Sequence, residues 1–206
     1  MSIQINYKPT YLNKKLINFV LFVDENFNLT VLKKYISKSD YYFIQDLLKN
    51  NDKKKDILFF DINSQKKIIL VSYKKNITST DTENLGAKFY DQIKDIKQND
   101  FIINSDMTKS NSKSLIGHFL HGIKLKSYIF EKYKSNKSKK KITINVIGKN
   151  LPSKADQLKF KAIEDGTFFA RDLVSEPGNI LHPDEYAKRL GSLKKIGLKI
   201  NVYDEK

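Results

Sequence analysis

Short apolar segments that alternate with amphipathic helical segments constrain the fold of this chain most. Residues 3–7 and 142–147 show the alternation of half-buried strands, and residues 16–23 form a denser apolar run typical of a central strand. Further strands are predicted at residues 57–60, 68–71, 101–103 and 198–203, the first two as a hairpin. Strands that alternate with helices predict an α/β sandwich with a mixed or largely parallel sheet.

Helices are predicted where apolar residues recur three or four positions apart. One covers residues 39–48, with Ser39 or Asp40 as its N-terminal cap. The next begins at Thr80, which forms a capping-box pattern with Glu83. A third is predicted at residues 112–123.

A long helix predicted from Ser153 leads into a break at Pro177 and Gly178. It carries apolar residues at helical spacing, namely Leu158, Ala162, Ile163, Phe169, Ala170 and Leu173. Gly166 lies inside this helix, where glycine costs stability, so close packing against a neighbour is expected there. Pro183 is predicted to start the next helix, which Gly197 ends, although His182 stands where a hydroxyl residue would more commonly cap it.

Composition limits the class of protein. The chain has 206 residues, of which 40% are hydrophobic, enough for one core or one core plus an appendage. It has no cysteine, which excludes disulfides and thiolate metal sites. No secretory signal is visible, and no apolar run approaches the roughly 20 residues that span a bilayer. These features predict a soluble, cytoplasmic protein.

The net charge of +15 raises the alternative of nucleic-acid binding. Lysines cluster at residues 53–55, 66–67 and 137–141. Only Arg171 and Arg189 are arginines, however, and base readout and bidentate phosphate binding favour arginine. The abundance of Lys, Asn and Ile favours compositional bias with a solvated lysine surface, and an anionic partner remains the alternative.

Two long motifs carry a resemblance to a known family. Residues 168–183 read FFARDLVSEPGNILHP, and residues 122–134 read GIKLKSYIFEKYK. Both resemble, in the same order, segments of the cytosol leucyl aminopeptidases, and the likeness extends over about residues 67–203. The signature positions, to which we assign structural roles, are Gly122, Tyr128, Phe130, Arg171, Asp172, Pro177, Asn179 and Pro183.

The resemblance implies a domain organisation. Residues 1–150 would form an N-terminal α/β domain similar to macro domains, residues 151–182 a linker helix and turn, and residues 183–206 the truncated beginning of the peptidase domain. Full-length members of the family are hexameric enzymes that use two divalent metals, Mn or Zn, to remove N-terminal residues from peptides. The expected partners are the missing catalytic portion or full-length subunits.

The family's catalytic and metal-binding motifs lie beyond the position that corresponds to Lys206. We therefore assign no catalytic, metal-binding or cofactor-binding residue. The resemblance implies a non-catalytic N-terminal part of a leucyl-aminopeptidase-type protein, inactive alone. The alternative is a lysine-rich module that binds nucleic acid or serves assembly without enzymatic activity.

Three local features are weighed against functional interpretations. His118 and His121 lie three apart on a predicted helix, but no third ligand follows at conventional spacing, so exposed or hydrogen-bonded histidines are expected rather than a metal site. Arg171 and Asp172 are expected to fix the linker helix as a charged pair. The turn at residues 71–75 lacks the glycines that the family has there, which makes binding of ADP-ribose-type ligands unexpected.

Overall fold

The computed structural model describes residues 2–8, 18–50, 55–106, 113–136, 138 and 140–203. The chain divides into two compact units, Met1–Glu164 and Asp165–Lys206, and each is described by itself. The long helix α4 (Lys154–Ser175) begins in the first unit and ends in the second. None of the helices in the described ranges is both long and apolar enough to cross a lipid bilayer.

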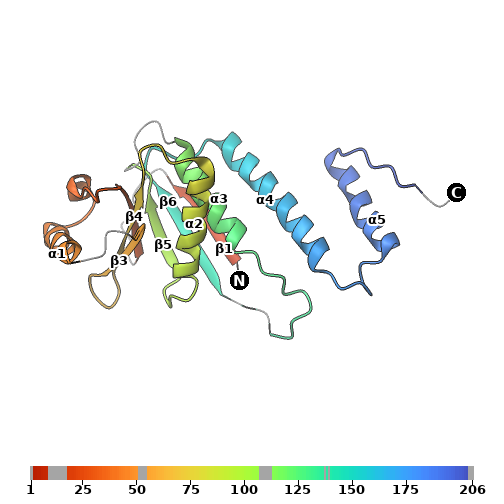
Figure 1. Ribbon diagram of the computed structural model, residues 1–206, viewed down its shortest axis with the longest axis horizontal. Helices are drawn as coiled ribbons and strands as arrows, with labels where there is room; N and C mark the ends of the chain where they lie inside the picture. The colour runs from red at the N-terminus through yellow and green to blue at the C-terminus, as the bar shows by residue number, and fades with distance from the viewer. Residues whose placement is uncertain are drawn as a thin grey trace. The chain divides into compact units, whose positions relative to one another are not determined.

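The first unit is built on a six-stranded sheet (Figure 1). Its strands, in the spatial order β1-β6-β5-β2-β4-β3, are β1 (Ser2–Lys8), β6 (Lys141–Ile147), β5 (Asp100–Asn104), β2 (Asn18–Asp24), β4 (Lys67–Tyr73) and β3 (Ile57–Asp61). All neighbours pair in parallel except β3, which is antiparallel to β4. The predicted α/β fold with a mixed sheet is therefore confirmed.

The position of each strand follows its hydrophobic pattern. Strand β2 pairs with both β4 and β5 and is buried from Asn18 to Val23, as expected for a strand covered on both faces. Strand β6 alternates, with Ile142, Ile144 and Val146 fully buried. The predicted hairpin is confirmed: Ile57 lies opposite Val71 in β3 and β4.

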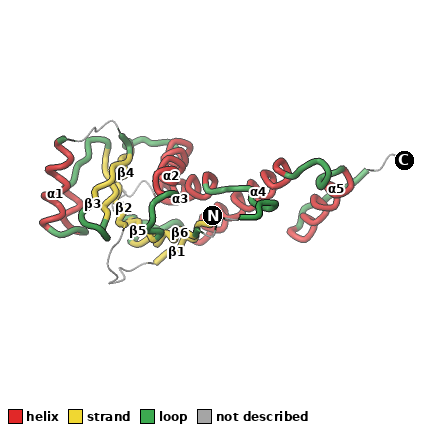
Figure 2. The backbone as a smooth tube through the Cα atoms, turned by 90° about the horizontal axis from the view of Figure 1, so that it is seen from below, coloured by secondary structure: helices red, strands yellow, loops and turns green. Residues whose placement is uncertain are grey.

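Helices cover the two faces of this sheet (Figures 1 and 2). Helices α2 (Ser79–Ile93) and α3 (Lys113–Lys126) pack on one face. The 3-10 helix η1 (Thr30–Lys34) and α1 (Lys38–Lys49) pack on the other, against β2, β3 and β4. The two hydrophobic clusters share the sheet, so the unit has a layered core.

The caps of two helices differ from the prediction. Ser37, rather than Ser39 or Asp40, caps α1 and accepts a hydrogen bond from the Asp40 amide at 3.1 Å. Thr78, not Thr80, caps α2 and accepts from the Asp81 amide at 3.0 Å. A cap needs an extended backbone, and Thr78 has it (φ −76°, ψ 163°), whereas Thr80 already lies within the helix.

Helices α2 and α3 approach closely through a reciprocal pair of glycines. A Cβ on Gly86 would lie 2.0 Å from the Phe119 carbonyl oxygen, and one on Gly122 would lie 2.0 Å from the Glu83 carbonyl oxygen. The absence of a side chain at each glycine therefore leaves room for the backbone of the facing helix. The close crossing brings Glu83 beside the face of α3 that carries His118.

The long helix α4 contradicts one prediction. It has no buried residue, and its apolar side chains Leu158 and Ile163 are 69% and 45% exposed. A Cβ on Gly166 would meet nothing within 4 Å, so close packing does not explain this glycine. Helical periodicity showed that these apolar residues share a face but could not show that anything covers that face.

The second unit contains the end of α4, α5 (Pro183–Gly191) and the 3-10 helix η3 (Ser192–Ile196). Pro183 starts α5 and Gly197 (φ 91°) ends η3, as predicted. His182 caps α5 without a side-chain hydrogen bond, which confirms the weak cap. The strand predicted at residues 198–203 is wrong, because these residues form no strand. A strand needs a partner for its backbone groups, and none of the described residues of this unit forms one.

Candidate functional site

The two histidines of α3 lie in a polar cluster between helices. The His118 Nδ1 atom is 2.7 Å from the Glu83 carboxylate of α2, and the His121 Nδ1 atom is 3.0 Å from the Glu164 carboxylate of α4. The His121 and Glu164 side chains are only 5% and 13% exposed. The prediction that these histidines are hydrogen-bonded helix residues is confirmed, but their acidic partners were not foreseen from the sequence.

The aromatic ring of Phe160, from α4, lies between the two imidazoles. Its centroid is 5.0 Å from that of His118 and 5.1 Å from that of His121. Glu164 follows Phe160 by one helical turn, so both side chains of α4 reach the same face of α3. The cluster therefore joins α2, α3 and α4 within the first unit.

The pKa of Tyr7, on the edge strand β1, is affected by Glu164 of this cluster. Burial raises the pKa of the Tyr7 phenol from 10.0 to about 12, and the Glu164 carboxylate adds to the rise. The folded protein thus favours the neutral phenol, and the unfolded chain loses this proton first as the pH rises above 10. The contribution of the neutral Tyr7 phenol to the free energy of unfolding is therefore complete below pH 10. It disappears as the pH approaches about 12.

The substitution Tyr7→Phe tests this linkage. We expect the variant to gain stability relative to the wild type between pH 10 and about 12, because it has no phenol to ionise on unfolding. Below pH 10 the difference in free energy of unfolding should be constant. Urea unfolding across this pH range measures it, with Tyr42→Phe as control because Tyr42 is 63% exposed. Parallel curves for wild type and Tyr7→Phe would contradict the assignment.

The histidine cluster does not have the chemistry of a two-metal centre. Within the described ranges, no group of three or more His, Cys, Asp or Glu side chains lies close enough together to hold a metal ion. His118 and His121 each engage a different glutamate, and the Phe160 ring lies between them. The described residues therefore do not fit the pair of metals that the resemblance implies for the full-length family.

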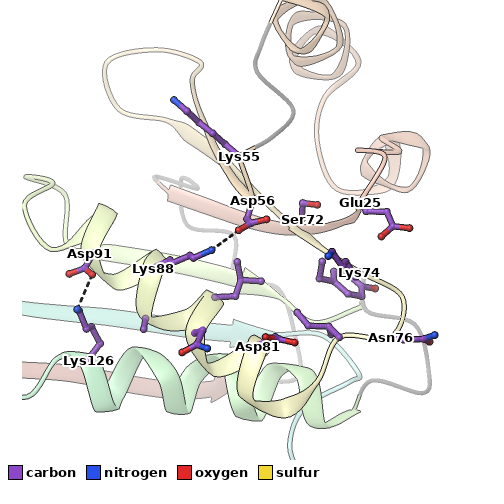
Figure 3. Close-up of a pocket in the computed structure, with 15 residues that line it drawn as sticks. Glu25, Lys55, Asp56, Ser72, Lys74, Asn76, Asp81, Lys88, Asp91 and Lys126 are labelled. Carbon is purple, nitrogen blue, oxygen red and sulfur yellow. Dashed lines mark hydrogen bonds and ion pairs between the residues drawn. The ribbon is translucent and has the colours of Figure 1, made fainter.

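A cavity of about 740 Å³ lies beside α2, at the carboxyl end of β4 (Figure 3). Ser72 and Tyr73, at the end of β4, and Lys74, in the glycine-poor turn that follows, contribute to its wall. The charged residues that line it are Glu25, Asp56, Asp81, Asp91, Lys55, Lys74, Lys88 and Lys126. The numbers of acidic and basic groups are equal, so the wall favours neither an anion nor a cation.

Several groups of this cavity are engaged within the fold. Lys88 pairs with Asp56 at 2.8 Å and Lys126 with Asp91 at 3.2 Å (Figure 3). The Ser72 hydroxyl donates to the Asp24 carbonyl oxygen at 3.3 Å. The two ion pairs tie α2 to the residue before β3 and to α3.

Lysines of the charge clusters are also used inside the fold. Lys66 pairs with Asp40, and Lys67 pairs with Asp61. The Lys140 ammonium donates to the carbonyl oxygens of Lys94 and Ile96 at the end of α2, where a cation also complements the helix dipole. Residues 53, 54, 137 and 139 lie outside the described residues. The arrangement of Lys66, Lys67 and Lys140 does not favour the nucleic-acid alternative.

In the second unit, a charged pair stabilises the turn between α4 and α5. The Arg189 guanidinium donates to the Glu176 carboxylate at 2.8 Å and to the Glu185 carboxylate at 3.0 Å. The Glu176 side chain is only 1% exposed. The sequence prediction concerned Arg171 and Asp172 and did not recognise this pair, although the scarcity of arginine pointed equally to Arg189.

The signature positions are distributed over both units. Gly122 lies in α3, while Tyr128 and Phe130 follow that helix and are half-buried. Arg171 and Asp172 lie in the second half of α4. The remaining positions surround the turn: Pro177 and Asn179 lie within it, and Pro183 is the first residue of α5. Their structural roles at the junction stay predictions.

Comparison with curated proteins connects this fold to a family. No family model matches the chain. A probable cytosol aminopeptidase of Clostridium perfringens is 30% identical over 155 residues, which cover 70% of this chain and 31% of that protein. The chain belongs to the cytosol aminopeptidase family. A second relative, from Chelativorans sp., is 39% identical over 92 residues, 41% of this chain and 18% of that protein. The chain spans less than a third of the length of these relatives and matches their N-terminal part.

Several solved structures show the same fold. A mutant of tomato leucine aminopeptidase superposes with a TM-score of 0.72 at 18% identity, over 95% of this chain and 42% of that chain. The cytosol aminopeptidase from Coxiella burnetii superposes with a TM-score of 0.63 at 14% identity, over 97% of this chain and 40% of that chain. The bottromycin maturation enzyme BotP, solved in complex with Mn, gives 0.64 at 12% identity, over 92% of this chain and 39% of that chain. At these identities the likeness concerns the fold.

Proposed function

We propose that the chain is the non-catalytic N-terminal part of a leucyl-aminopeptidase-type protein. The observation that carries this proposal is the combination of a family match restricted to the N-terminal part of the relatives with described residues that contain no metal-binding cluster. The parent activity would be the removal of N-terminal residues from peptides. Two divalent ions would supply the activated water and the polarised carbonyl in the catalytic part.

The role proposed for this chain is structural. It would contribute residues 1–150 as a folded domain, residues 151–182 as a linker and residues 183–206 as the beginning of the peptidase domain. The partner would be the catalytic portion of the protein or full-length subunits, and the setting the cytoplasm. The exposed apolar side chains of the second unit support a partner: Val174, Ile196 and Tyr203 are 87%, 74% and 88% exposed.

An activity assay tests the proposal. The purified chain should show no turnover of leucine p-nitroanilide above the uncatalysed rate with Mn²⁺ or Zn²⁺, because no described group can hold the metals. The full-length Clostridium perfringens relative serves as the positive control in the same buffer. Metal-dependent turnover that co-purifies with the chain and disappears with EDTA would contradict a non-catalytic role.

A further inference from the structure

The first half of α4, residues 154–164, contributes no buried residue to the first unit. Leu158 and Ile163 are exposed, whereas Phe160 and Glu164 are partly buried. Helices α2 and α3, in contrast, each contribute several buried side chains to the core. Elements with few buried contacts open more readily than the core they rest on. The contacts that α4 does make therefore decide how firmly it is held.

In the first contact, the Phe160 ring packs on the surface of α3 at Gly117, His118 and His121, which we call the socket. A Cβ on Gly117 would lie 2.5 Å from the Cε2 atom of Phe160, so only glycine leaves room for the ring in this position. The imidazoles of His118 and His121 form the sides of the socket. Glycine inside a helix costs stability, and here the ring explains its presence.

The second contact is the pair formed by His121 and Glu164, one helical turn further along α4. Both side chains are nearly buried. Separating them inside the protein would leave a buried carboxylate without a partner, which is costly. The Glu164 carboxylate also contributes to the raised pKa of Tyr7, which places it within electrostatic reach of β1. The pair can separate at low cost only if Glu164 moves into water together with α4.

We propose that the contacts of Phe160 and Glu164 with α3, which we call the latch, are lost together. The first half of α4 then detaches from α3 in a single step, while the sheet, α2 and α3 stay folded. The two contacts lie on one helical face and share His121, so the loss of either weakens the other. A detached segment of this length is at best marginally helical in water. All residues of these two contacts belong to the first unit.

Amide hydrogen exchange of the whole chain tests the latch, followed by mass spectrometry of peptides. In the wild type, amides of residues 154–164 should exchange roughly tenfold or more faster than the core amides of α2 and α3. Gly117→Ala, which displaces the ring, and Glu164→Ala, which removes the pair, should each accelerate exchange of residues 154–164 roughly tenfold further. Exchange in α2 and α3 should stay within about twofold of the wild type.

Two comparisons make the result decisive. Leu158→Ala changes an exposed residue of the same segment and should leave its exchange unaltered. Gly117→Ala should add nothing in a Phe160→Ala background, because the ring it displaces is already absent. The latch is refuted if Gly117→Ala and Glu164→Ala leave residues 154–164 unchanged, or if they accelerate the whole first unit equally. An equal effect of Gly117→Ala with and without the Phe160 ring would also refute it.

Discussion

Gly122→Ala is expected to destabilise the first unit by about 3 kcal/mol or more, at the upper end of the range for overpacking. The added Cβ would lie 2.0 Å from the Glu83 carbonyl oxygen and 2.8 Å from its Cα atom. Both atoms belong to the backbone of α2, so no side chain can move aside. The helices must separate, which opens the packing of both against the sheet. Urea denaturation followed by far-UV circular dichroism measures the loss.

Gly166→Ala is the matched control for this prediction. Gly166 also lies inside a helix, but a Cβ there would meet nothing within 4 Å. Alanine should therefore stabilise α4 by about 0.5–1 kcal/mol through its lower backbone entropy in the unfolded chain. The same substitution thus has opposite signs at the two positions. If Gly122→Ala is neutral or stabilising, the close crossing of α2 and α3 is wrong.

Phe119→Ala has the second large expected effect, a loss of about 3–5 kcal/mol. Phe119 is fully buried and links the helical layer to the sheet. Its ring lies 5.2 Å from that of Phe22 in β2, edge to face, and 5.4 Å from that of Phe89 in α2. Truncation leaves a cavity that the surrounding rings cannot close without losing these contacts.

Equilibrium unfolding of Phe119→Ala can be compared with Tyr42→Ala. Tyr42 is 63% exposed on α1, so its truncation should change the free energy of unfolding by less than about 0.5 kcal/mol. Equal effects of the two substitutions would show that Phe119 is not part of a close-packed core. A reduced urea midpoint with an unchanged slope for Phe119→Ala would confirm a loss of stability without a change in the unfolded state.

The strands show how far local patterns lead. The run of apolar residues in β2 indicated a central strand, and the structure places β2 between β4 and β5. The alternation in β6 likewise indicated which side chains are buried. The same kind of pattern at residues 198–203 was misleading, because the apolar alternation of a strand has no structural consequence without a partner strand.

The caps show a different limit. Thr78 and Thr80 are both suitable hydroxyl residues, each followed three positions later by an acidic residue. The sequence favoured Thr80 because of Glu83, but the Glu83 side chain binds His118 of α3 instead. The tertiary contact thus removed the partner on which the local prediction depended.

The polar cluster around α3 could not be predicted from spacing. His118 is 35 residues from Glu83 and His121 is 43 residues from Glu164 along the chain. Only the packing of three helices brings these groups within hydrogen-bonding distance. Gly117 was a local signal for the socket, since glycine is unfavourable inside a helix, but its meaning depends on a ring contributed by α4.

By itself, the sequence determined the described strands and α-helices of the first unit, though not the 3-10 helix η1, and it determined which family the chain belongs to. These properties depend on hydrophobic periodicity and on motifs that are local in the chain. Only the tertiary structure decided which glutamate meets which histidine, which glycines lie at helix contacts and whether the apolar stripe of α4 is covered. These depend on contacts between residues far apart in sequence, and a segment carries no information about its partners until the chain has folded around it.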